Sequence, residues 1–152
     1  MKRCFFIGHR YADCSIYDRL YQAVESAIEK GVTEFIVGHY GAFDRMAAKA
    51  VKQAKKRYSI RLVMLLPYHP AQRPMDLPEE FDEFFYPSDM EKVPLRLAIV
   101  QANRRAVEGA DCVIAYVRHD SGNSAKILNY AKRLSRKKTM SIYNIGEEKE
   151  QA

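Results

Sequence analysis

The chain has 152 residues, 47% of them hydrophobic, which is enough for one domain with an ordinary core. No segment reaches the roughly 20 consecutive apolar residues of a membrane-spanning helix, and the apolar run at the N-terminus is too short for a signal peptide, so we expect no membrane partner. The net charge of +6 permits nonspecific attraction to nucleic acid but does not require it.

The first part of the chain predicts a strand followed by a helix. An apolar run at 3–8 ends in a glycine and predicts the strand. The stretch 15–31 has apolar residues at helical spacing and predicts the helix. Ser15 and Asp18 approximate a capping box at its start, and Gly31 is expected to end it.

The next part repeats this order and then becomes irregular. A strand is predicted at 34–38, a helix at 42–58 and a second, continuously apolar strand at 60–67. The segment 68–93 contains four prolines and is predicted to be irregular, except for a short strand at 83–87.

The last part of the chain predicts a helix between Pro94 and Gly109, which suit a helix start and a helix end. The remaining elements continue the alternation, and they are a strand at 111–117, a helix at 122–137 and a strand at 139–145. Strands without polar alternation are typical of a parallel sheet covered by helices on both faces, so we predict an α/β fold. One domain is predicted over residues 1–145, followed by a charged tail at 146–152.

Ligands of such folds bind at the carboxyl ends of the strands, which directs attention to the loops that follow strands. In the first of these loops, Gly8 would allow a ligand to approach the backbone, and the planar fork of Arg10 suits phosphate or carboxylate. His9 could donate a hydrogen bond to an anion. The alternatives are an internal ion pair for Arg10 and a structural role for His9.

Two further loops open helices with glycines, as anion-binding helix N-termini do. Gly38 and Gly41 precede the helix at 42–58, and Asp44 in its first turn could bind a ligand hydroxyl or only complement the helix dipole. The other loop carries five candidate residues, Asp120, Ser121, Gly122, Asn123 and Ser124. Ser121 or Asn123 could instead be an ordinary N-cap.

Three candidates lie outside these loops. Tyr68 follows the strand at 60–67 and could stack on a base, although the prolines around it could simply stiffen a loop. Asn103 and Arg104 lie on the helix before the strand at 111–117, where an arginine is often only a solvated residue.

Three scattered cysteines without C-x-x-C spacing are typical of a reducing compartment, so we expect a cytoplasmic protein. Cys4 and Cys112 lie in apolar runs and are expected in the core, whereas Cys14 lies in a polar turn. No zinc-ligand spacing is present, so neither a metal nor a resident cofactor is predicted. The zinc alternative depends on four histidines that follow predicted strands, His9, His39, His69 and His119.

Five segments in this order resemble the SLOG superfamily, which includes the Lonely-Guy phosphoribohydrolases and the DNA-processing-A proteins. They are CFFIGHR, GVTEFIVGHYGAFDRMAAKAV, LPYHPAQ, NRRAVEGADCVIAYV and GNSAKILNYAKRL, and the resemblance covers roughly residues 3–143. It is nearest to small, single-domain bacterial members of unassigned function. It implies a Rossmann-like, doubly wound, mostly parallel sheet that binds a nucleotide or nucleotide-derived ligand.

Carried over by position, the resemblance places several of the candidates at the ligand: Gly8, Arg10, Gly38, Gly41, Asp44, Asn103, Arg104, Gly122, Asn123 and Ser124. The chain departs from the family in its last loop, which has one glycine and no following glutamate. Lys126 stands where the related deoxyribosyltransferase turn has a nucleophilic glutamate. Glycosidic cleavage needs a carboxylate, so the resemblance leaves enzymatic activity open.

Three functions follow from these patterns. The first is binding of a nucleotide-derived small molecule with little or no catalysis. The second is a phosphoribohydrolase or nucleotide N-glycosidase, whose carboxylate would come from Asp44, Asp120, Asp89 or Glu91. The third is a nucleic-acid binder, which is disfavoured because no aromatic–basic interleaving is visible. A homodimer through apolar residues of 94–107 is expected only by analogy.

Overall fold

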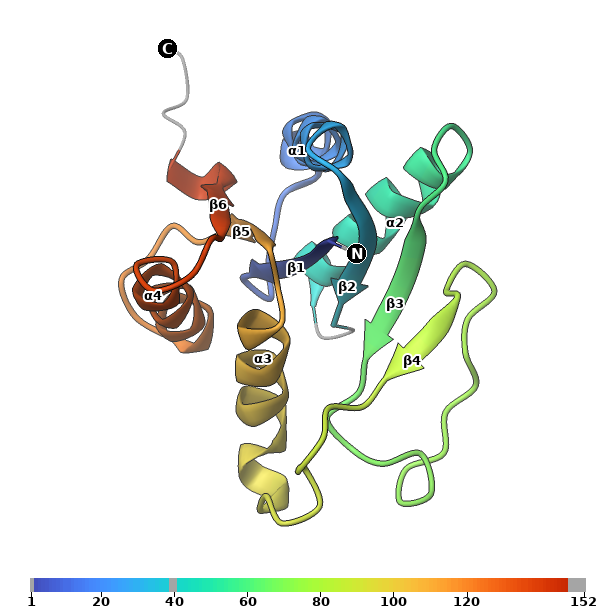
Figure 1. Ribbon diagram of the computed structural model, residues 1–152, viewed down its shortest axis with the longest axis vertical. Coiled ribbons are helices and arrows are strands. Elements are labelled where there is room, and N and C mark those ends of the chain that lie inside the picture. The colour runs from blue at the N-terminus through green and yellow to red at the C-terminus, as the bar shows by residue number, and fades with distance from the viewer. Residues whose placement is uncertain (1, 39–40, 148–152) are drawn as a thin grey trace.

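The computed structural model describes residues 2–38 and 41–147, which form one six-stranded sheet with all strands parallel. The strand order is β4-β3-β2-β1-β5-β6 (Figure 1). The strands are β1 (Lys2–Gly8), β2 (Val32–Val37), β3 (Arg61–Leu65), β4 (Glu83–Phe85), β5 (Cys112–Tyr116) and β6 (Ser141–Asn144). This confirms the α/β, Rossmann-like, doubly wound prediction, and the sheet is wholly parallel across these residues.

The strand order reverses at β1. From β1 the chain builds outward through β2, β3 and β4, and then crosses to β5 on the other side of β1. Gly8, at the end of β1, pairs with Tyr116 at the end of β5. The crevice outside these two strand ends is therefore the switch point at which ligands of open α/β sheets bind.

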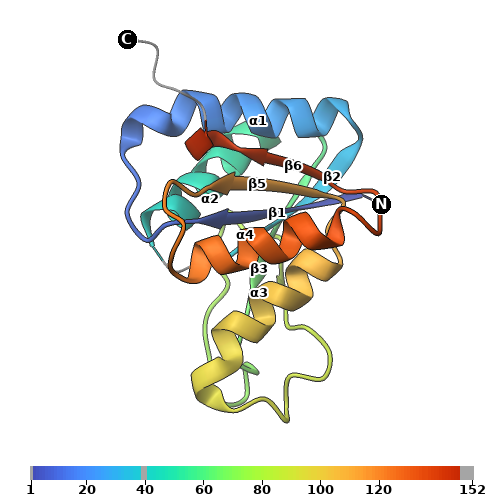
Figure 2. The same cartoon turned by 90° about the vertical axis from the view of Figure 1, so that its left-hand side faces the viewer.

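Helices cover both faces of the sheet. The α-helices are α1 (Tyr17–Glu29), α2 (Ala42–Lys55), α3 (Ala98–Glu108) and α4 (Asn123–Leu134), and the short 3-10 turns are η1 (Cys14–Ile16), η2 (Leu95–Leu97) and η3 (Ile145–Glu147). Alternate residues of each strand face opposite sides, so Cys4 and Phe6 pack under α1 and α2, whereas Phe5 and Ile7 pack under α3 and α4. Figure 2 shows α3 and α4 side by side on the near face of the sheet.

The predicted ends of the helices are mostly confirmed. Gly31, with φ of +99°, follows α1, and Gly109 ends α3. The capping box at Ser15 and Asp18 was wrong. Asp13 accepts a hydrogen bond from the backbone N–H of Ser15 at 2.8 Å and caps η1, because the chain enters α1 through this preceding turn.

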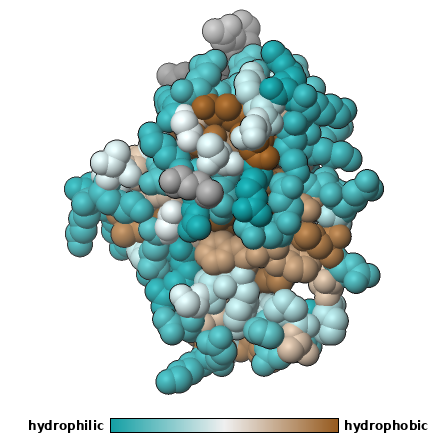
Figure 3. Space-filling model, turned by 45° about the vertical axis from the view of Figure 1, so that its right-hand side comes forward, coloured by the Kyte–Doolittle hydropathy of each residue, from teal (hydrophilic) through white to brown (hydrophobic). Residues whose placement is uncertain are grey.

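The face seen in Figure 3 is mostly hydrophilic, and hydrophobic residues gather on it in separate patches. Across the described part of the chain, every helix is too short or too polar to cross a membrane. Cys4 and Cys112 are buried neighbours on β1 and β5, and Cys14 is exposed, as expected.

Candidate functional site

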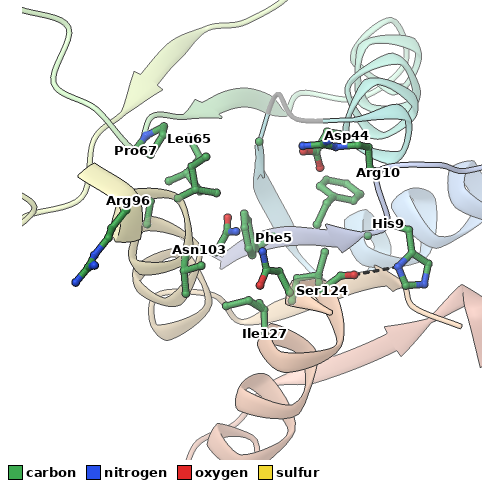
Figure 4. Close-up of a pocket in the computed structure, with 18 residues that line it drawn as sticks. Phe5, His9, Arg10, Asp44, Leu65, Pro67, Arg96, Asn103, Ser124 and Ile127 are labelled. Atoms are coloured by element: carbon green, nitrogen blue, oxygen red, sulfur yellow. Dashed lines mark hydrogen bonds between the residues drawn. The ribbon is translucent and has the colours of Figure 1, made fainter. Parts of the chain in front are cut away.

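A pocket of about 460 Å³ opens at the carboxyl edge of the sheet, beside the switch point. Its volume lies within the range of small-molecule sites. Its wall includes the carboxyl ends of β1 and β3, residues of the loops after β1, β2 and β3, and Asp44 from the first turn of α2. The other side of the pocket is formed by η2, α3 and the first turns of α4. We call it the sheet-edge pocket, and Figure 4 shows its lining residues.

The sheet-edge pocket brings together eight of the fourteen candidates chosen from the sequence. They come from segments distant along the chain, and they are Gly8, His9, Arg10, Gly38, Asp44, Asn103, Asn123 and Ser124. Gly41 and Gly122 do not line the pocket, but they are the N-caps of α2 and α4 beside it. The remaining four do not line it, namely Tyr68, Arg104, Asp120 and Ser121.

These four candidates have other surroundings. Tyr68 lies under the guanidinium of Arg73, with 4.0 Å between the guanidinium carbon and the ring centroid. Arg104, next to Asn103 on α3, lines a second hollow instead of this pocket. Asp120 and Ser121 are exposed in the turn before α4. Adjacent residues of a helix project in different directions, so they can line different hollows.

Gly41 and Gly122 open their helices in nearly the same conformation, with φ/ψ of 112°/176° and 98°/173°. Only glycine adopts this region readily. Neither helix has a side-chain capping hydrogen bond at its N-cap. Asn123 and Ser124 of the first turn of α4 line the pocket, so the partial positive charge of that N-terminus faces it. The first turn of α2 carries Asp44, whose carboxylate complements the positive end of that helix. A Cβ on Gly41 would stand 2.7 Å from the Cα of Arg10, and Ala42 donates a hydrogen bond to the Arg10 carbonyl at 2.7 Å.

Gly8 is required by packing within the protein, whereas a side chain at Gly38 would meet the movable end of Asp44. A Cβ on Gly8 would stand 2.1 Å from the Phe43 ring, and one on Gly38 would stand 2.9 Å from an Asp44 carboxylate oxygen. Gly8 was expected to make room for a ligand. It does line the pocket, but its missing side chain primarily admits Phe43 and so brings α2 close to β1.

Both ring nitrogens of His9 are hydrogen-bonded. Nε2 accepts from the backbone N–H of Arg118 at 2.8 Å, and Nδ1 lies 3.0 Å from the Ser124 hydroxyl oxygen. An accepting Nε2 places the proton of the neutral ring on Nδ1, which then donates to Ser124. The hydroxyl proton of Ser124 is then not used in the bond with His9, so Ser124, rather than His9, has a proton that it can donate into the pocket.

The surroundings of His9 favour its neutral form. Burial lowers the pKa of His9 from its ordinary value of 6.5, and the charges of His119 and Arg118 lower it further. The His119 ring lies 4.9 Å from the His9 ring, centroid to centroid. A second proton on His9 would also face the N–H of Arg118, so protonation would break the link between β1 and the loop after β5.

Asn144, at the end of β6, holds that loop from the other side. Its amide oxygen accepts from the N–H groups of Val117 and Gly146, and its amide nitrogen donates to the Val117 carbonyl, all at 3.0 Å. Asn144 is buried, and these bonds satisfy its polar atoms. They fix the backbone directly before Arg118, whose N–H in turn positions His9.

Charged side chains stand on opposite sides of the sheet-edge pocket. Figure 4 shows Arg10 beside Asp44 on one side and Arg96 on the other. Asp44 is the one carboxylate among the described residues of the lining. Lys126 is exposed and lies outside this pocket, so it does not face a ligand there as the alignment with the deoxyribosyltransferase turn had suggested.

The sequence did not single out one wall of the pocket. Leu65 and Pro67 at the end of β3, with Ile99 and Val100 of α3, give this wall an apolar surface. The rule that ligands bind at the carboxyl ends of strands also applies to Leu65 and Pro67, because both lie at the end of β3. The predicted candidate Tyr68 follows them directly in the sequence but does not line the pocket. Arg96 had no signal beyond its place near a helix start.

Across residues 2–38 and 41–147, no group of three or more His, Cys, Asp or Glu side chains could hold a metal ion. His39, one of the four histidines of the zinc alternative, lies outside these residues. Comparison with models of known protein families and with curated protein sequences gives no match. Membership of the SLOG superfamily therefore stays a prediction from the motifs.

Proposed function

We propose that this chain binds a nucleotide or nucleotide-derived small molecule in the sheet-edge pocket. The observation that carries the proposal is the convergence of two helix N-termini, both without side-chain caps, on one pocket at the switch point between β1 and β5. The SLOG resemblance implies the same ligand class and a single-domain bacterial protein, and the three scattered cysteines favour a reducing cytoplasm as its location.

The polar side of the pocket suits the anionic part of such a ligand. The first turn of α4 offers backbone N–H groups, and Ser124 offers a hydroxyl proton that His9 has oriented. Arg10 can supply a planar pair of donors from the opposite loop. A phosphate held between α4 and Arg10 would meet donors from two sides, and charge-assisted bonds of this kind are the strong ones.

The apolar side suits a base or a sugar face. Leu65, Pro67 and Ile99 form an apolar wall, and Asn103 carries both a donor and an acceptor beside it. An amide at the edge of an apolar slot can pair with the edge of a nucleobase, which has the same mixture of groups. The two sides together match a molecule that is anionic at one end and flat and apolar at the other.

The proposal is tested by thermal denaturation with a panel of nucleoside monophosphates, ADP-ribose, ribose 5-phosphate and inorganic phosphate. A ligand at one hundred times its Kd stabilises the folded state by about 2.7 kcal/mol, which is a readily measured rise in Tm. Replacing Ser124→Ala removes a bond to the anion and should weaken binding about tenfold or more. Ser121→Ala, in the same turn but outside the pocket, is the matched control.

No shift with any member of the panel at millimolar concentration would contradict the proposal. An equal loss of binding in the Ser121→Ala and Ser124→Ala proteins would show that the anion does not bind at Ser124 at the start of α4. The melting temperatures without ligand separate both results from simple destabilisation.

A second candidate function, cleavage of an N-glycosidic bond, is favoured by one observation: Asp44 lines the pocket. A carboxylate there could stabilise or attack an oxocarbenium-like centre. Of the four carboxylates considered from the sequence, Asp120, Asp89 and Glu91 do not line it. Release of free base from a nucleoside monophosphate, lost in Asp44→Asn while the nucleotide still binds, would establish this enzyme. Binding without release would leave the first function alone.

A further inference from the structure

A second hollow of about 680 Å³ lies on the outer side of α3 and α4, away from the sheet. We call it the α3–α4 groove. Five of its nine lining residues are cations, and they are Arg104, Lys126, Lys132, Arg133 and Arg136. None of the nine is acidic. The groove is therefore a concentrated positive surface in a chain whose net charge is already +6.

An aromatic ring lies among these cations. The Arg104 guanidinium stands 4.6 Å from the Tyr130 ring centroid, and the Arg133 guanidinium stands 5.8 Å from it. Both guanidinium groups lie within cation–π distance of the ring, which favours keeping these two charges close together beside Tyr130. Arg104 comes from α3 and the other two from α4, so the basic–aromatic alternation exists in space although the sequence does not display it.

The cations extend along α4. Lys126, Lys132 and Arg133 lie on α4 itself, and Arg136 lies in the turn after it. Lys126 and Arg133 are seven positions apart, which corresponds to roughly 10 Å along the helix. A single phosphate is too small to contact the whole row. Glu147 pairs with Lys132 at 3.3 Å and partly neutralises it, but the other four cations leave the row strongly positive. The row fits a ligand with several negative charges in succession.

We propose that the α3–α4 groove binds single-stranded nucleic acid, with the cations on successive phosphates and the floor of the groove against the bases. That floor is Tyr130 with Val100 and Ile127, which a simple polyanion would not use but an unstacked base would. A flat anionic membrane surface would meet the cations but leave the apolar and aromatic residues of the hollow without contact, so it would use only part of the groove. A second copy presenting the same cations would be repelled.

The groove and the sheet-edge pocket share Val100 and Ile127. A nucleic-acid strand in the groove would therefore pass close to the pocket, with Val100 of α3 and Ile127 of α4 between the two. The groove nevertheless has its own cations, all outside the pocket lining, so the two binding sites can be tested separately.

The test uses the anisotropy of a fluorescent oligothymidylate of roughly 20 nucleotides, a length of the order of natural single-strand sites, titrated with the full chain at several salt concentrations. Contact with three or four phosphates gives a slope of about −2 to −3 for log K against log salt. The double variant R133E/R136E should bind at least tenfold more weakly at low salt, and its slope should shrink by about 1.4. Tyr130→Leu should weaken binding without changing the slope.

The matched control is K52E/K56E on α2, which makes the same change in net charge on the opposite face of the sheet and should bind almost normally. R133E/R136E should keep any nucleotide-induced thermal shift, whereas Ser124→Ala should keep oligonucleotide binding. The proposal is overturned by absent binding at low salt, by an equal loss in the control variant, or by anionic vesicles binding where the oligonucleotide does not. Equal displacement by inorganic polyphosphate would overturn the assignment to nucleic acid.

Discussion

His9 joins two strand ends through hydrogen bonds on both sides of its ring. The backbone of Arg118 donates to one nitrogen, and the other nitrogen faces the Ser124 hydroxyl. A histidine after a strand could have been a direct ligand contact, and sequence alone gave no means of choosing. The geometry assigns His9 to positioning, because each nitrogen already has a partner and Ser124 is the residue left with a proton to donate.

This arrangement makes the stability of the protein depend on pH. Burial, followed by the charges of His119 and Arg118, lowers the pKa of His9 below 6.5 in the folded state. The contribution of neutral His9 to the free energy of unfolding is therefore complete above pH 6.5 and is lost as the pH falls through the lowered pKa. An NMR titration of the His9 ring should have its midpoint below 6.5, and His119→Gln should raise it. A midpoint at or above 6.5 in the unmodified chain would refute this description.

Strand β6 contributes to the site although none of its residues lines the pocket. Its last residue, Asn144, extends the pattern of backbone bonds past the end of β5 and fixes Val117. Gly146 then packs so closely on Val117 that a Cβ would stand 2.7 Å from the Val117 carbonyl oxygen. Asn144 and Gly146 thus brace the loop that opens α4.

Replacing Asn144→Ala should lower the free energy of unfolding by about 1–3 kcal/mol, because it leaves buried backbone groups of Val117 without partners. Asn144→Asp keeps the accepting oxygen but places a second oxygen against the Val117 carbonyl, so it should be at least as destabilising. Urea denaturation measures both. Asn129→Ala, on the exposed face of α4, is the control and should change stability little. An Asn144→Ala variant with an unchanged free energy of unfolding would show that the bonds of Asn144 to Val117 do not stabilise the fold.

For the whole molecule, the periodicity of the chain was sufficient to predict the fold. Continuous apolar runs such as 60–67 could only be strands buried on both faces, and glycines at helix ends marked most boundaries. The parallel order then brought three loops to one edge, as expected. The direction of individual side chains was harder to predict than the fold. Asn103 and Arg104 are neighbours in the sequence, but they line different hollows.

Contacts between distant segments explain the rest of the differences. Gly8 is a glycine because of Phe43, which lies on another element, and the stacking of Arg104 on Tyr130 joins two helices. Neither pairing has a signature within a local window of sequence. A local window of sequence also does not show which way a helical side chain points. Lys126 aligns with a catalytic position of the deoxyribosyltransferase turn, but it lies outside the lining of the sheet-edge pocket.

The sheet also predicts how stability is distributed over the molecule. β1, β2 and β5 have a strand on each side, whereas β4 and β6 are the edges of the described sheet and have only three and four residues. Amide hydrogen exchange should therefore be slowest in β1, β2 and β5, at rates set by global unfolding, and faster in β4 and β6. A ligand in the sheet-edge pocket should slow exchange at Arg118 and in the first turn of α4, because both belong to the His9–Ser124 link. Equal protection of β4 and β1 would contradict the predicted distribution of stability over the sheet. If a bound nucleotide protected only segments remote from the His9–Ser124 link, the switch point between β1 and β5 would not be the binding site.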